Sequence, residues 1–153
     1  MRTCLLLFWL VNMISGAILA QPRSAPASVS PLTHKGRVLS VGYGGGVAGR
    51  SVAYYLLDNG RLFGKRRVDT TFVELKAQSL GSTKQLFRTL ETSARIRTTR
   101  FNEPGNTYRF VGWQRGRTRH RVVWGQPSPK PPAAYPRFYA RFMALIPDSL
   151  RLR

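Results

Sequence analysis

The chain of 153 residues carries 25 lysines and arginines against six aspartates and glutamates, which gives a formal net charge of +19 at pH 7. This length allows one domain with one hydrophobic core and is too short for a cofactor domain joined to a separate substrate domain. Cys4 is the single cysteine, so an intrachain disulfide is excluded. The positive charge favours an anionic partner, such as an envelope polysaccharide, a nucleic acid or an acidic protein, although an arginine-rich surface without any partner has the same composition.

The first twenty residues have the composition of a secretory signal peptide. Arg2 gives a positive start, an apolar stretch begins at Cys4, and small residues at Ala17 and Ala20 are compatible with cleavage. An uncleaved anchor is the alternative, but the apolar stretch is interrupted and barely reaches the roughly 20 residues that a spanning helix needs. We therefore expect a secreted or periplasmic protein that contacts a membrane only through residues 1–20.

The rest of the chain divides by composition. Residues 21–34 are rich in proline, serine and alanine and predict a flexible tether. Residues 35–147 predict a single domain, and residues 148–153 predict a basic C-terminal tail. A second proline-rich stretch at 125–132 separates the last predicted strand from the last predicted helix.

Strands are predicted through the first half of the domain. Residues 37–43 alternate in polarity, and residues 50–57 are β-branched and aromatic at their centre. The Asn-Gly step within 58–60 predicts a tight hairpin turn of the primed type, because such a turn needs positive φ at both central residues. A short extended run follows at 61–63, and residues 68–75 predict a further strand.

Helices and strands mix in the second half. Ser82 and Gln85 have capping-box spacing at the start of a helix predicted over residues 83–94. The remaining predicted segments are an extended stretch at 95–101, a turn at 102–106, strands at 107–114 and 117–124, and a closing helix with apolar residues from Tyr135 to Met143. This order predicts an α+β fold, with an antiparallel sheet of about five to seven strands and two amphipathic helices packed on one face.

The glycine-rich segment at 44–49 admits two interpretations. Gly44, Gly46 and Gly49 have the G-x-G-x-x-G spacing of the dinucleotide fingerprint, which requires a helix directly after the loop. Residues 50–57 favour a strand instead, so we interpret the segment as a structural glycine loop between two strands. That loop consists of Gly44, Gly45, Gly46 and Gly49. A small flavin- or nicotinamide-binding oxidoreductase fragment is the alternative that the fingerprint would support.

The glycine loop and the C-terminal third carry a resemblance. Residues 44–49 before a strand resemble the glycine loop of emfourin-type protease-inhibitor domains, and the run at 107–124, Pro131-Pro132 and a closing helix are similar too. Val47 stands where that loop has an aromatic residue. The chain also resembles uncharacterised secreted proteins of Bacteroidota through YYLL-DNG-RLF, FNEPGN and VVWG. The emfourin resemblance implies a non-enzymatic domain that blocks a metalloprotease, and it assigns no contact residues.

Residues suited to catalysis are sparse. His34 lies in the predicted tether, and His120 lies within a predicted strand, where packing in the sheet is the simpler role. Neither an HExxH motif nor paired cysteines are present, and the glutamates at 74, 91 and 103 are scattered. We expect no enzyme, no metal and no cofactor.

One arginine pattern stands out. Arg115, Arg117, Arg119 and Arg121 occupy every second position, which on a strand places 117, 119 and 121 on one face, with Arg115 in the preceding turn. Thr118, His120, Val122 and Trp124 then face the helices. Arg109 on the partner strand could extend the basic surface. The predicted anion-binding face is therefore Arg109, Arg115, Arg117, Arg119 and Arg121, with an ordinary solvent-exposed face as the alternative.

Together these features predict a non-enzymatic exported binding domain. Its partner is either a protein, such as a protease, or an anionic envelope polymer, and sequence-specific nucleic-acid binding is not expected. A purely structural envelope component is a further possibility that the sequence leaves open.

Overall fold

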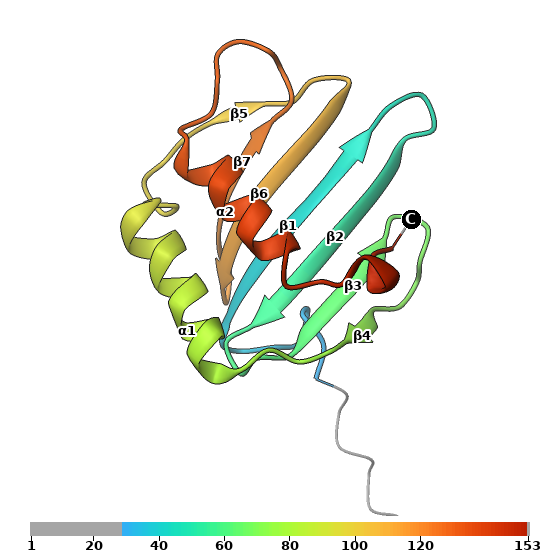
Figure 1. The fold of residues 1–153 in the computed structure, drawn as a ribbon, viewed down its shortest axis with the longest axis vertical. Coiled ribbons are helices and arrows are strands. Elements are labelled where there is room, and N and C mark those ends of the chain that lie inside the picture. Colours follow the sequence, from blue (N-terminus) through green and yellow to red (C-terminus); the bar gives the residue numbers. More distant parts are fainter. Residues whose placement is uncertain (1–28, 153) are drawn as a thin grey trace, which may run out of the picture.

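The computed structural model describes residues 29–152, in which one seven-stranded sheet carries both α-helices on the same face (Figure 1). The sheet is open and almost entirely antiparallel, which confirms the predicted α+β class. The predicted signal peptide, with its cleavage positions Ala17 and Ala20, and most of the predicted tether lie outside the described residues.

The sheet has the order β4-β3-β2-β1-β6-β7-β5, so the first strand lies at its centre. Every neighbouring pair is antiparallel except β5 and β7, which are parallel. The strands are β1 (Arg37–Gly45), β2 (Arg50–Leu57), β3 (Leu62–Arg66), β4 (Val73–Leu75), β5 (Asn102–Glu103), β6 (Thr107–Arg115) and β7 (Thr118–Trp124). The helices are α1 (Leu80–Arg88), the π-helix η1 (Thr89–Ser93), α2 (Ala134–Met143) and the 3-10 helix η2 (Asp148–Leu150).

The main core lies between the sheet and the helices. Alternate residues of each strand point to this side, because successive side chains of a strand face opposite ways. Leu39 and Val41 of β1 are fully buried there, against aromatic residues of α1 and α2. The side chains of these helices that complete the core are Leu86, Phe87, Tyr135, Phe138 and Phe142. Val122 and Trp124 of β7 join the same core, as the alternation predicts.

The opposite side of the sheet carries no helix and has a smaller cluster of its own. Val38, Leu57 and Phe63 are buried there. Phe72, from the segment between β3 and β4, packs edge-on against Tyr55, with ring centroids 5.4 Å apart. We call this side the helix-free face and the other the helix-covered face.

The glycine loop is a hairpin connection. Gly45 at the end of β1 pairs with Arg50 at the start of β2, so residues 46–49 form the turn. Gly45, Gly46 and Gly49 all have positive φ, a backbone conformation that glycine adopts readily. Gly44, which was predicted to belong to the loop, lies within β1 instead and pairs with Ser51. A strand follows the loop, so the helix that the dinucleotide fingerprint requires is not at this position.

The second hairpin is also present, but its turn differs from the prediction. Leu57 and Arg61 flank the loop, where the Leu57 N–H donates to the Arg61 carbonyl at 2.9 Å. Gly60 has φ of +88°, whereas Asn59 does not have positive φ, so the predicted primed turn is wrong. The Asn59 side chain instead accepts from the Arg61 N–H at 3.1 Å and closes the turn locally.

The start of α1 corrects the predicted capping box. Ser79, rather than Ser82, is the N-cap, and its hydroxyl accepts from the Ser82 N–H. The helix ends through η1 at Arg95, which has positive φ. The predicted extended stretch at 95–101 is wrong, because the chain forms turns there, and the burial of Ile96 accounts for part of its apolar pattern.

Two further segments depart from their predicted form. Of the strand predicted over 68–75, only β4 is extended, because Asp69 accepts from the Arg66 backbone N–H at 2.9 Å and turns the chain. Beyond η2, Arg151 donates to the carbonyl of Met143 at 2.9 Å, and Leu152 N–H donates to the Tyr54 hydroxyl. Residues 148–152 therefore pack against the helix-covered face.

None of the helices within residues 29–152 combines the length and the hydropathy needed to cross a membrane.

Candidate anion-binding surface

Two of the five predicted arginines share the helix-free face. Arg121 pairs with Gly112 of β6 and Arg119 pairs with Gln114, and directly paired residues point to the same side of a sheet. Both arginines are exposed. The guanidinium carbon of Arg121 lies 3.7 Å from the ring centroid of Phe110, which is a close cation–π stack.

Arg109 and Arg115 lie on the other side of the sheet, so the prediction of one common face is wrong. Arg109 pairs with Trp124, which is buried under the helices, and its guanidinium carbon lies 5.7 Å from the Tyr139 ring of α2. Arg115 is the last residue of β6 rather than part of the turn, and it pairs with Thr118. The register explains this division, because odd-numbered residues of β6 face even-numbered residues of β7.

Arg117 lies in the two-residue turn between β6 and β7 and is exposed. The strand begins one residue later than predicted. Arg117 therefore lies at the end of the sheet next to Arg119, without the fixed orientation that a strand position would give it.

Aromatic side chains complete the basic region of the helix-free face. Arg121 lies in one row with Gly112, Ser40 and Tyr55, because these residues are paired across β7, β6, β1 and β2. Burial raises the pKa of the Tyr55 hydroxyl, and the positive charge of Arg121 acts in the opposite direction. Only the small residues Gly112 and Ser40 lie between them in this row.

A second row adds Lys65 to the same face. Lys65, Ala53, Gly42 and Phe110 are paired across β3, β2, β1 and β6. The ring of Phe110 lies over Gly42, where a Cβ atom would come within 2.6 Å of it. We call the set Tyr55, Lys65, Phe110, Arg119 and Arg121 the basic–aromatic face.

Carboxylates do not pair with the basic residues of this face. All six carboxylates lie within the described residues, and five of them form ion pairs with other basic residues; one of these, Glu74, lies on the helix-free face opposite Phe63 and pairs with Arg61. Their partners are His34, Arg37, Arg61, Arg66 and Arg151. Within residues 29–152, neither Arg119 nor Arg121 has a carboxylate in ion-pair contact, so their charge is available to an external anion.

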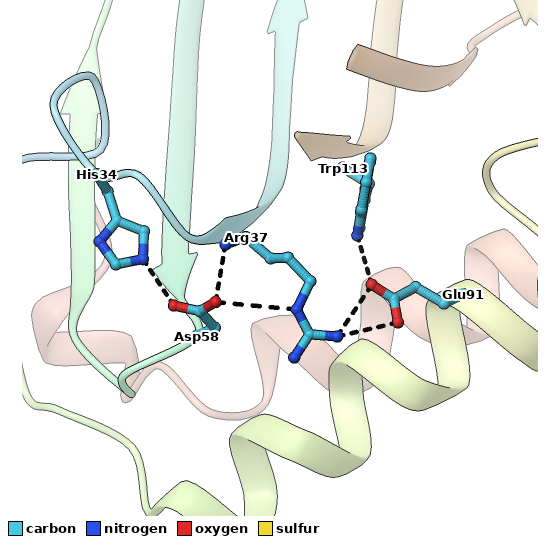
Figure 2. A network of polar contacts seen from close by, with 5 residues as sticks. All are labelled: His34, Arg37, Asp58, Glu91 and Trp113. Atoms are coloured by element: carbon cyan, nitrogen blue, oxygen red, sulfur yellow. Dashed lines mark hydrogen bonds and ion pairs between the residues drawn. The ribbon is translucent and has the colours of Figure 1, made fainter. Parts of the chain in front are cut away.

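A polar network at the start of β1 uses two of those carboxylates (Figure 2). Asp58 lies 2.6 Å from His34 Nε2 and accepts from the Arg37 backbone N–H at 2.8 Å. The Arg37 guanidinium donates to Glu91 of η1 at 3.1 Å, and the indole N–H of Trp113 donates to the same carboxylate at 2.7 Å. His34, which was predicted to lie in the tether, is therefore bound to the folded domain by this network.

The pKa of Asp58 links the stability of this network to pH. Burial by itself would raise the pKa of Asp58, but hydrogen bonds from Arg37 and His34, with their charges, outweigh it and lower the pKa. A carboxyl whose pKa is lower in the folded state stabilises the fold above its unfolded pKa of about 3.9, and this contribution is lost as the pH falls.

We therefore expect Asp58→Asn to lower the free energy of unfolding by roughly 1–2 kcal/mol at pH 7, because hydrogen bonds to a charged acceptor are replaced. The difference from the wild type should shrink at pH 3. Urea unfolding at both pH values measures it, and the other carboxylates titrate equally in both proteins. A difference that stays constant with pH would contradict this account of Asp58.

His120 is the other histidine. It is partly buried, and its ring centroid lies 5.8 Å from that of Trp113. Desolvation lowers its pKa, and the positive charges of Arg100 and Arg97 act in the same direction. Among the described residues, no cluster of three or more histidine, cysteine, aspartate or glutamate side chains is arranged to hold a metal ion.

Sequence patterns alone did not identify Tyr55, Lys65 and Phe110 as neighbours of the arginines. The alternation of each strand assigns them to one of two faces, but only the pairing register of the strands shows that all of them share a face with Arg121.

No protein-family model matches the chain, and no curated protein matches it.

Proposed function

We propose that this protein is a non-catalytic binding domain that holds an anionic polysaccharide of the cell envelope on its basic–aromatic face. The observation that carries this proposal is the stack of Arg121 on Phe110, with Arg119 exposed beside it on the face that has no helix. The secretory composition of residues 1–20 supports a location outside the cytoplasm.

The stacked arginine is well suited to this role. A guanidinium group that lies flat on a ring keeps its N–H donors at its edge, where they can bind a carboxylate or sulfate through two parallel hydrogen bonds. Stacking also restricts the long side chain before the partner binds, which lowers the entropy lost on binding. Arg121 is therefore preorganised for an anionic group.

The spacing of the two arginines favours a polymer over a single ion. Arg119 and Arg121 are two positions apart on one strand, which separates their attachment points by about 7 Å along β7. Two cationic groups in line can bind successive anionic groups of one chain. Such binding is strongly weakened by salt, because the Debye length falls from about 10 Å at 0.1 M to about 3 Å at 1 M.

A matched pair of double variants tests the proposal. Arg119→Gln/Arg121→Gln removes two charges from the basic–aromatic face, and Arg88→Gln/Arg141→Gln removes two exposed charges from the helices on the other side. Net charge is equal in the two proteins, so bulk attraction is the same. Arg151 is unsuitable as a control position, because it donates to backbone carbonyls.

On an immobilised sulfated polysaccharide, we expect the Arg119/Arg121 variant to elute at clearly lower salt than the Arg88/Arg141 variant, which should elute close to the position that its charge alone predicts. Loss of the Arg121–Phe110 stack should cost about 0.5–1 kcal/mol, and the other surface substitutions about 0.5 kcal/mol or less each, so both proteins should remain folded. Elution of both variants at the same salt would show that the face is only a solvated surface.

A further inference from the structure

We propose that a cavity on the helix-covered face, at the end of the sheet near the glycine loop, binds a small carboxylate with a ring-shaped body. The cavity has a volume of about 570 Å³ and lies between β1, β6, β7 and α2. The side chains that give it its chemistry are Tyr43, Arg50, Arg109, Trp124, Gln126 and Tyr139. This site is separate from the basic–aromatic face, because Arg109 and Arg121 point to opposite sides of the sheet.

The strand register builds the floor of the cavity. Tyr43, Arg109 and Trp124 are paired with one another across β1, β6 and β7 and form one row. The next row toward the end of the sheet consists of Arg50, Gly45 and Thr107. Gly45 has no side chain, and the Asn106 carbonyl oxygen occupies the place that its Cβ would take, so Arg50 and Thr107 are the residues of this outer row that present side chains.

Helix α2 supplies the aromatic wall. The Tyr139 ring meets the Trp124 ring edge-on, with centroids 5.8 Å apart, and the Arg109 guanidinium lies over the Tyr139 ring. Burial raises the pKa of the Tyr139 hydroxyl, although the charge of Arg109 opposes this effect. The phenol therefore keeps its proton at neutral pH and can donate a hydrogen bond.

The lining determines the class of ligand. It contains two arginines and no aspartate or glutamate, so it favours an anion and disfavours a cation. Its aromatic walls favour a flat or ring-shaped body, and its hydroxyl and amide groups can bind polar substituents. Ligand pockets typically measure about 300–1,000 Å³, so the volume fits a molecule with one or two rings. A ring that carries a carboxylate satisfies all of these conditions.

Such a carboxylate could be a sugar acid or an aromatic acid, and titration calorimetry on the purified protein distinguishes them. The probes are D-glucuronate, benzoate and, as a neutral match for the first, D-glucose. We expect heat of binding from at least one of the two acids and none from glucose at the same concentration. Binding of glucuronate alone identifies a sugar acid site, and binding of benzoate alone identifies an aromatic acid site.

Single variants locate the binding. Arg109→Gln should weaken the affinity for the acid at least tenfold, and Arg50→Gln should weaken it as well, whereas Arg88→Gln, at an exposed position of α1 outside the cavity, should leave it unchanged. Arg50 and Arg109 are both exposed, and each is replaced separately. If one variant does not fold, the other still tests the proposal.

The proposal is overturned if neither acid binds, if glucose binds as well as the acids, or if Arg109→Gln and Arg50→Gln bind with wild-type affinity. None of these results bears on polysaccharide retention by the basic–aromatic face, which the Arg119/Arg121 variant measures separately.

Discussion

Gly45→Ala is expected to lower the free energy of unfolding by about 3 kcal/mol or more, which would be one of the largest single-site effects in the domain. Gly45 has φ of +100°, where an L-residue is strained, and a Cβ atom at this position would overlap the Asn106 carbonyl oxygen of the loop before β6. The clash involves backbone, so a side-chain rotation cannot relieve it.

Gly46→Ala is the matched control for this prediction. Gly46 also has positive φ, at +75°, but an added Cβ would have no heavy atom within 4 Å. Gly46→Ala should therefore lower the free energy of unfolding only through the strain of an L-residue at positive φ, by about 1 kcal/mol. Thermal or urea unfolding of both variants measures the difference. Equal losses would mean that the hairpin end does not pack against the loop before β6 as described.

Glu91→Ala is expected to lower the free energy of unfolding by roughly 2–3 kcal/mol. Trp113 is 5% exposed, and its indole N–H donates to the Glu91 carboxylate, so alanine leaves a buried donor without its partner. Loss of the Arg37–Glu91 ion pair adds little to this destabilisation, because the Arg37 guanidinium is partly exposed and still has the Asp58 carboxylate as an ion-pair partner. Most of the loss should therefore come from the indole.

Two comparisons separate these contributions. Glu91→Gln keeps an acceptor for the indole and should cost about 1 kcal/mol. Glu74→Ala removes an exposed pair with Arg61 and should cost about 0.5 kcal/mol or less. Urea unfolding followed by tryptophan fluorescence reports all three variants. If Glu91→Ala costs no more than Glu74→Ala, the buried hydrogen bond is not an important source of stability.

The strands with strong local signals were predictable from sequence. Residues 50–57 form β2 within the predicted limits, because β-branched and aromatic residues between two glycine-bearing turns leave few alternatives. The closing helix was equally clear, since its apolar residues recur at helical spacing and become the buried face of α2. In both segments, local propensity and burial favour the same structure.

The prediction from sequence was wrong where an irregular backbone conformation interrupts a segment with a regular polarity pattern. The apolar alternation at 95–101 resembles a strand, yet Arg95 takes positive φ after a π-helix and the chain turns. The prediction that all five arginines share one face was partly wrong for a different reason. Period two along β7 correctly placed Arg119 and Arg121 together, but the face of Arg109 depends on how β6 pairs with β7, and a single strand contains no information about that register.

The most direct test of the proposed function is to map the bound polysaccharide onto the arginines by NMR. The side-chain Nε–H signals of the arginines would be followed while a short sulfated oligosaccharide is added. We expect the largest shifts at Arg121 and Arg119, accompanied by shifts of the Phe110 and Tyr55 ring signals, and only small shifts at Arg88 and Arg141. Shifts of similar size at all exposed arginines would show diffuse attraction by net charge and would contradict a defined binding face.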